Sequence, residues 1–232
     1  MFFERSLILV DIFKTFFNGQ VLIENLPLLL QGLGVTFELG ISSIIAGMIL
    51  GLAVALVRIY ALAPFRAAAI VYIDIFRSIP ILVLLIIVYY ALPFIGIRLT
   101  SFWAAWTALT LVSGAYTAEI FRAGIEAIPK GQFEASQALG LGYPYMMVDV
   151  VLPQAIRIVI PPLTNNCINV MKDTALASVV AMPDLLKQAT QAQALAANPT
   201  PLIGAALIYI LMLWPLVALV SRLEKRFKAG RH

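Results

Sequence analysis

Long runs of apolar residues, uncharged over the length of a membrane-crossing helix, dominate the chain. A helix needs about 20 largely apolar residues to cross the hydrocarbon core of a bilayer. Four uncharged runs reach about that length, at residues 39–57, 78–97, 99–118 and 202–220. The pattern therefore predicts an all-α membrane protein.

A fifth apolar run is shorter and less regular. The uncharged stretch 158–171 contains Pro161-Pro162 and continues through Lys172 and Asp173 into further apolar residues. Its length leaves open whether it is a transmembrane helix or a re-entrant segment. With five spans, ten Lys and Arg residues fall on one side of the membrane and four on the other. The positive-inside rule then favours five spans, with the amino terminus outside and the carboxyl terminus in the cytoplasm.

This count divides the chain into three parts. Residues 1–27 are predicted to form an amphipathic stub on the membrane surface, 28–225 the transmembrane domain and 226–232 a cytoplasmic tail. Within the domain, the predicted spans cover about 33–57, 70–95, 100–121, 155–175 and 201–221, with a cytoplasmic loop at 122–154.

Composition agrees with a lipid bilayer as the surrounding medium. The chain is 62% hydrophobic and 12% charged, far from the average of soluble domains. Its net charge of +4 is dispersed at helix ends, which argues against nucleic acid as a partner. The sequence has one cysteine, Cys167, one histidine, His232, and no phosphate-binding glycine loop. We therefore expect no catalytic residue, metal site or cofactor in this chain.

The first predicted span carries small residues at four-residue spacing: Ser43, Gly47, Gly51 and Ala55. Such a stripe lets helices approach closely in lipid. We interpret it as packing within one subunit, with a dimer seam as the alternative.

The polar loop contains a spaced motif. Glu134-Ala135-Ser136 is followed after three residues by Gly140, and after nine more by Val150-Val151-Leu152-Pro153. The local chemistry predicts a short helix over about 132–139, which Gly140 ends in a left-handed cap. Gly142-Tyr143-Pro144 then turns the chain back.

This spacing resembles the EAA loop of the permease subunits of type I ABC importers, with Ser136 and Val150 as conservative departures. Stretches 76–80, 115–122 and 172–176 resemble the polar amino-acid branch of that family, although Ala175 stands where serine is usual. The resemblance covers about residues 28–225. It implies the type I importer permease fold and a location in the bacterial inner membrane.

The resemblance also implies partners. They are a second permease chain, identical or homologous, two ABC ATPase subunits that bind ATP and Mg, and a periplasmic or lipid-anchored amino-acid-binding protein. The loop would dock on an ATPase through six residues: Glu134, Ala135, Ser136, Gly140, Leu152 and Pro153. A surface helix without a partner is the alternative interpretation.

Polar residues at membrane depth are candidates for a substrate path, because lipid cannot solvate them. Asn165, Asn169 and Lys172 share one helical face, with Asp173 and Thr174 at its edge. We expect this stripe to face a cavity or a partner helix. Structural hydrogen bonding is the alternative to a path.

Two pairs of charges stand three residues apart and can form structural ion pairs: Asp74 with Arg77, and Glu119 with Arg122. Arg77 is also a candidate to hold a substrate carboxylate. Arg77 and Lys172 favour glutamate or aspartate as the substrate, with glutamine, arginine and histidine left open. The predicted function is therefore inward, ATP-driven transport of a polar amino acid.

The alternative function is an ion-coupled secondary amino-acid transporter. That class predicts inverted repeats with paired broken helices, whereas this chain has one Pro-broken segment in its apolar runs.

Overall fold

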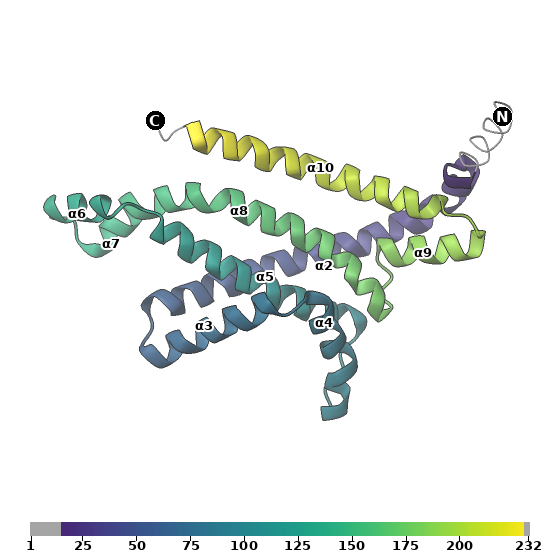
Figure 1. Cartoon of the computed structure of the whole chain (residues 1–232), viewed down its shortest axis with the longest axis horizontal. Helices are drawn as coiled ribbons and strands as arrows, with labels where there is room; N and C mark the ends of the chain where they lie inside the picture. Colours follow the sequence, from purple (N-terminus) through teal and green to yellow (C-terminus); the bar gives the residue numbers. More distant parts are fainter. Residues whose placement is uncertain (1–14, 230–232) are drawn as a thin grey trace, which may run out of the picture.

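The computed structural model describes residues 15–229, and every regular element in that range is helical. Figure 1 shows α2, α5, α8 and α10 lying along the long axis of the molecule, and contacts join each of them to its neighbours. The elements are α2 (Gly19–Tyr60), α3 (Ala63–Ser78), α4 (Ile81–Ile86), η1 (Ile87–Ala91), η2 (Leu92–Ile95), α5 (Ser101–Glu126), α6 (Lys130–Ala138), α7 (Tyr143–Tyr145), η3 (Met146–Val151), α8 (Leu152–Asp173), η4 (Thr174–Val180), α9 (Leu185–Ala196) and α10 (Thr200–Ala229).

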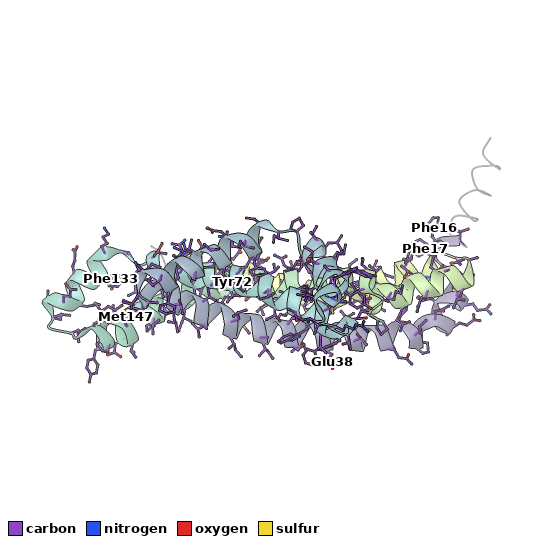
Figure 2. All side chains as sticks on the ribbon, turned by 90° about the horizontal axis from the view of Figure 1, so that it is seen from below. Phe16, Phe17, Glu38, Tyr72, Phe133 and Met147 are labelled. Atoms are coloured by element: carbon purple, nitrogen blue, oxygen red, sulfur yellow. The ribbon has the colours of Figure 1, made fainter. Side chains whose placement is uncertain are left out.

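The two ends of the bundle differ. One end, which we call the loop end, carries residues 127–151 and the turn between α2 and α3. Phe133 and Met147 lie there, far from Phe16 and Phe17 at the opposite end (Figure 2). The opposite end carries α9, beside the start of α10 (Figure 1).

Within residues 15–229, three helical segments are long and apolar enough to cross a membrane: Gly19–Tyr60, Tyr143–Val180 and Thr200–Arg222. The bent pair α3 and α4–η2 passes the same test when taken together. A further long helix, α5, has 26 residues and is about 39 Å long at 1.5 Å per residue. It is rich in Ala, Ser, Thr and Gly because α2, α3 and α8 surround it, so it needs little lipid-facing surface. Three to four of the described segments are thus long and apolar enough to span a membrane, and the expected count of about five, which includes α5, stays a prediction.

The predicted span over 70–95 is not one straight helix in the structure. The chain bends by 101° between α3 and the segment Ile81–Ile95. The cause is Pro80, which lacks an N–H and pushes the preceding residue out of the helical region. Ile79 accordingly has φ −81° and ψ 128°.

The amino-terminal boundary also differs from the prediction. Asn18 caps α2 by accepting hydrogen bonds from the N–H groups of Gln20 (3.1 Å) and Val21 (3.3 Å). The helix then continues through Pro27 for 42 residues. Residues 19–27 therefore belong to α2 rather than to a separate stub, and residues 1–14 lie outside the described range.

The fifth predicted span is present, with different bounds, as α8. This helix is continuous through Pro161-Pro162, because packing against α5 and α10 holds it together despite two missing N–H donors. It gives way at Thr174 to a 3₁₀ segment, which Ala181 ends in the left-handed region at φ 58°. At the other boundary α10 extends to Ala229, so the predicted tail begins as helix.

The small-residue stripe of α2 packs within the chain, as expected. Ser43, Gly47, Gly51 and Ala55 are all buried. A Cβ atom added at Gly51 would lie 2.5 Å from the Cβ of Thr117 on α5. The stripe therefore sets how closely α2 approaches the central helix.

Candidate functional site

The loop helix α6 ends as the sequence predicts. Gly140 has φ 76°. Its N–H donates to the carbonyl of Gln137 (2.9 Å), and the N–H of Leu141 donates to the carbonyl of Ser136 (3.1 Å). These two bonds define a Schellman cap, which satisfies carbonyls that the helix end would leave unpaired.

The base of the loop is fixed, whereas its tip is exposed. Ser136 is buried, and its hydroxyl donates to the carbonyl of Gln132 at 2.7 Å, so a small residue is needed at this position of the motif. The side chain of Gln154 on α8 donates to that of Gln132 at 3.1 Å. Glu134, Ala135 and Gly140 are exposed. Leu139 is 81% exposed, so an apolar side chain stands free on a rigid base.

Leu152 and Pro153 form the start of α8 behind the loop. Leu152 is partly exposed on the flank of the loop, and Pro153 occupies the first turn, where a missing N–H costs little. The six motif residues thus share the loop end, but the buried Ser136 cannot itself contact a partner.

A polar cavity of about 240 Å³ opens between α4, α5 and α8. Three of the residues predicted for a substrate path line it, namely Asn169, Lys172 and Asp173. Other polar groups on its walls come from α5 and α8, and they are Ser113, Tyr116 and Asn166.

Three predicted path residues lie elsewhere, and one of them, Arg77, lines a neighbouring cavity described below. The hydroxyl of Thr174 is buried and donates to the carbonyl of Met171 at 2.7 Å, so it has a structural role. Asn165 is exposed and does not line this cavity.

Sequence reasoning missed Asn166. Its side-chain amide donates to the hydroxyls of Ser113 and Thr117 on α5, both at 3.2 Å. The available signal was the i, i+4 spacing of these two hydroxyls in the third predicted span, which marks a polar face on an otherwise apolar helix.

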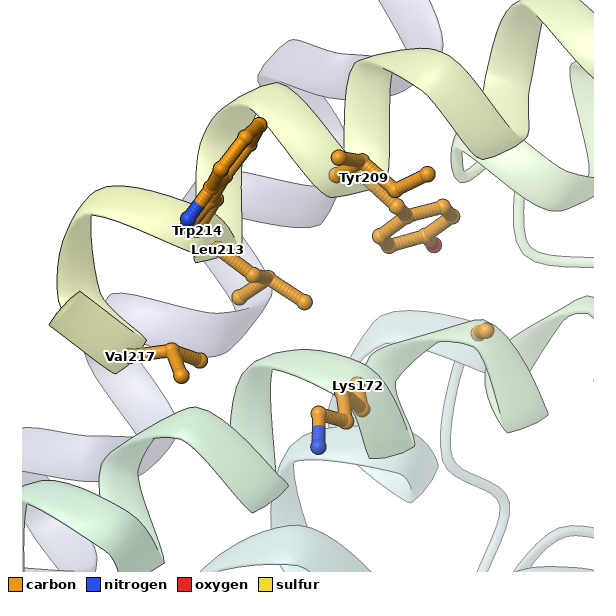
Figure 3. A pocket seen from close by; sticks show the side chains of 7 residues that line it. Lys172, Tyr209, Leu213, Trp214 and Val217 are labelled. Carbon is orange, nitrogen blue, oxygen red and sulfur yellow. The ribbon is translucent and has the colours of Figure 1, made fainter.

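Lys172 stands between two environments. Its stem borders an apolar groove of about 430 Å³ between α8 and α10. Figure 3 shows that its nitrogen points away from Tyr209 and Leu213 on α10. This arrangement leaves the hydrocarbon stem in apolar surroundings while the ammonium avoids them.

A cluster of charges lies along α5, nearer the loop end than the polar cavity. Glu119 pairs with Arg58 of α2 at 2.9 Å, with Arg122 on its own helix, and with Arg77 of α3 at 3.9 Å. Arg122 also pairs with Glu126. The expected Glu119–Arg122 pair is therefore present within a network that joins three helices.

The expected pair between Asp74 and Arg77 is wrong. Across the described residues Asp74 forms no ion pair, and Arg77 instead reaches Glu119 and lies 5.5 Å from the ring centre of Tyr116. Arg77 lies in the last turn of α3, and its side chain points toward α5 rather than toward Asp74.

The charge cluster and the polar cavity are neighbours. A second cavity of about 220 Å³ is lined by Arg77, Tyr116, Glu119 and Pro162 among others, and Tyr116 borders both cavities. Hydrogen-bonding groups and charges of both signs thus follow one another along α5 and α8. Such a row suits a small zwitterion that carries both an ammonium and a carboxylate.

Comparison with known proteins places this arrangement in a family. Residues 22–229 match the family described as binding-protein-dependent transport system inner membrane component. The arginine transport system permease protein of Bacillus subtilis (strain 168) is 40% identical over 210 residues, covering 90% of this chain and 96% of that protein. The probable glutamine ABC transporter permease protein GlnM of the same organism is 36% identical over 216 residues, covering 91% and 98%.

Solved structures agree. A crystal structure of an amino acid ABC transporter with histidines matches with a TM-score of 0.83 and 35% identity, covering 88% of this chain and 96% of that one. A methionine ABC transporter in inward-facing conformations matches with a TM-score of 0.65 at 22% identity, covering 90% and 96%, and supports the fold alone. The chain therefore belongs to the binding-protein-dependent inner membrane components, as a multi-pass permease subunit of a bacterial ABC importer for amino acids.

Proposed function

We propose that this permease moves a polar amino acid inward through the polar cavity by alternating access. The observation that carries the proposal is the clustering of Asn166, Asn169, Lys172 and Asp173 on one wall of a cavity within the helical bundle. Polar and charged groups at that depth are costly unless they serve a pathway or are fully paired.

In this proposal the loop end faces the cytoplasm, which agrees with the surplus of Lys and Arg there. Two partner ATPase subunits bind ATP and Mg and dock against the loops of two permease chains. The exposed Glu134 and Leu139 on the capped helix α6 support such a contact. An external binding protein delivers the amino acid to the end that carries α9.

The structure weakens the argument for an acidic substrate. Arg77 already has Glu119 as a partner, and Asp173 lines the same cavity as Lys172. One carboxyl and one ammonium complement the two charges shared by every amino acid, so they select no side-chain charge. We therefore propose glutamine-like neutral side chains alongside glutamate and aspartate.

Two asparagines on one helix provide a matched test. Asn169 lines the cavity and Asn165 does not, and both are exposed. Each is replaced by leucine in the complete transporter, reconstituted in vesicles with its ATPase and loaded binding protein. We expect Asn169→Leu to lower ATP-dependent uptake per assembled complex at least tenfold, because losing one hydrogen bond to a charged group costs about 1.5–3 kcal/mol, whereas Asn165→Leu stays near wild type.

Equal uptake by both variants would show that the cavity is not the path. Uptake without any ATPase present would instead identify a carrier driven by an ion gradient.

A further inference from the structure

The segment that connects the loop to α8 is not a regular α-helix. Residues Tyr143–Val180 form one helical stretch, and within it η3 is a π-helix. The N–H of Leu152 donates to the carbonyl of Met147, five residues back, where an α-helix would use the residue four back. Turns of this kind are rare, and they often lie where a helix bends. We call residues 146–153 the π joint.

Pro153 explains why the helix is irregular at this place. Proline has no N–H, so the carbonyl of Asp149, four residues earlier, lacks its usual helical donor. The same arrangement occurs at η1, where the N–H of Leu92 donates to the carbonyl of Ile87 and Pro93 follows. In both cases the proline stands in the first turn of the next helical segment. Bending the π joint therefore breaks fewer α-helical bonds than bending the regular helix that follows it.

The side chains packed around the joint are adaptable. Met146 and Met147 are buried with Val151 and Ala155 in one cluster, against which Phe133 of α6 packs (Figure 2). In an unbroken α-helix Met146, five residues before Val151, would point about 140° away from it, so the π turn brings both methionines to the cluster. Methionine is flexible and fills space in several conformations. The cluster can therefore stay packed while the angle at the joint changes.

The side chain of Gln154 bridges the joint. Its amide nitrogen donates to the carbonyl of Val150, on the loop side of Pro153, at 2.9 Å, and to the side-chain oxygen of Gln132 on α6 at 3.1 Å. The bond to Val150 fixes which end of the amide is the donor, because a carbonyl only accepts. Both bonds depend on rotatable side-chain torsions. Gln154 thus holds α6 to α8 in this arrangement and can follow a change in the angle between them.

We propose that the π joint is the hinge between the loop and the membrane-spanning part of α8, with Gln154 as a positioning residue. This inference rests on the proposed function, in which the loop docks on an ATPase and alternating access tilts the helices around the polar cavity. A docked loop keeps its orientation on the ATPase, so a tilting α8 must change its angle to the loop. The π joint is where that change breaks the fewest backbone hydrogen bonds.

Deleting one residue tests the hinge and preserves the packing. Val148 is 61% exposed, and its deletion leaves Met147 three and Met146 four residues before Val151, each within about 60° of it in a regular α-helix. The deletion therefore favours an α-helical connection with both methionines still on the cluster.

The assay uses the complete transporter in vesicles, with radiolabelled glutamine, glutamate or arginine, whichever the wild type takes up. We expect the Val148 deletion to keep the ATPase but to lower ATP-dependent uptake per complex about tenfold, because bending a regular helix leaves at least one further buried carbonyl unpaired. The control Val148→Ala keeps the residue count and should take up the amino acid like wild type.

A reversible cross-link tests the hinge with the residue count intact. Gln132→Cys and Gln154→Cys are combined with Cys167→Ser, and a short bis-methanethiosulfonate links the two introduced thiols. We expect linking to lower uptake about tenfold with the ATPase still bound, by the same argument, and reductant to restore uptake. The control links Gln154→Cys to Arg157→Cys, three residues apart on α8, and should leave uptake unchanged.

Equal uptake by linked and reduced protein would overturn the hinge, and so would wild-type uptake by an assembled Val148 deletion. If the deletion variant does not assemble, the cross-link decides, because its reduced state is the folded reference. The proposed function fails in a different way: ATP-dependent uptake would then be missing from the wild type and from the reduced protein as well.

Discussion

Replacing Gly51 by alanine tests the close contact between α2 and α5. The added methyl carbon would lie 2.5 Å from the Cβ of Thr117 and 2.8 Å from the carbonyl oxygen of Gly114. Contacts this short require the helix backbones to separate, because neither atom belongs to a flexible side-chain end. The same helix offers a control at Gly34, where an added Cβ meets open space.

The expected magnitudes follow from two opposing terms. Alanine in place of glycine within a helix contributes about 1 kcal/mol of stability. Overpacking a dense interface costs about 1–3 kcal/mol, and contact with backbone puts Gly51 at the upper end of that range. Gly51→Ala should therefore lose about 2 kcal/mol while Gly34→Ala gains about 1 kcal/mol. Gly40→Ala should fall between them, since its new methyl meets the flexible side chain of Met171.

The measurement is the apparent melting temperature of the purified chain in one detergent, with all variants at the same concentration. For a chain of this size about 1 kcal/mol corresponds to roughly 2–4 °C, so the two extreme variants should differ by about 6–12 °C. If Gly51→Ala melts at or above Gly34→Ala, the stripe does not set the spacing of α2 and α5.

Three further predictions concern the loop, a buried carboxyl and the orientation. The Gly140→Val protein should insert in the membrane but lose association with the ATPase, because a branched side chain is strained at φ 76°. The control Gly131→Val, at ordinary helical φ, should keep the ATPase association. Equal co-purification of the ATPase with the two variants would argue against the docking model. Burial raises the pKa of Asp184 to about 6, so ionisation of this carboxyl destabilises the folded state increasingly between about pH 4 and 6. Asp184→Asn keeps the acceptor for the N–H of Lys187 and removes the charge. This variant should raise the melting temperature above pH 6 by an amount worth up to about 3 kcal/mol, and it should have no effect near pH 4. A pH-independent gain would contradict that account. Cysteine placed at Gly131 should be labelled from the cytoplasm only, and cysteine at Asn198 from outside only, whereas labelling of both from one face would refute the proposed orientation.

Local chemistry made some features predictable from the sequence. The end of α6 follows from one glycine after a short helical pattern, and its cap involves residues no more than five apart. The stripe on α2 follows from spacing alone, since small residues four apart must share a helical face. These predictions needed no knowledge of what lies across the interface.

Features that depend on distant partners were not predictable in the same way. The bend at Pro80 had a local signal, but apolar residues on both sides gave the appearance of one long span. The partner of Arg77 is Glu119, on a different helix, and a sequence shows only the nearer Asp74. Asn166 was passed over because its bonding hydroxyls, on Ser113 and Thr117, lie about 50 positions earlier in the chain.

The charge cluster and the loop are connected to the cavity by continuous helices. From the loop, α8 runs without a break from Leu152 to Asp173, about 33 Å, and ends in the cavity wall. Beside it, α5 carries Glu119 and ends at Glu126. Arg58 of α2 and Arg77 of α3 both form ion pairs with Glu119, so these ion pairs join α2 and α3 to α5. A displacement of the loop would therefore move α8 against a block of three helices held together by ion pairs. The hydrogen bonds from Asn166 join α8 to α5 at the wall of the polar cavity. We therefore expect the cavity to change shape first beside Asn166, where α8 would move against α5.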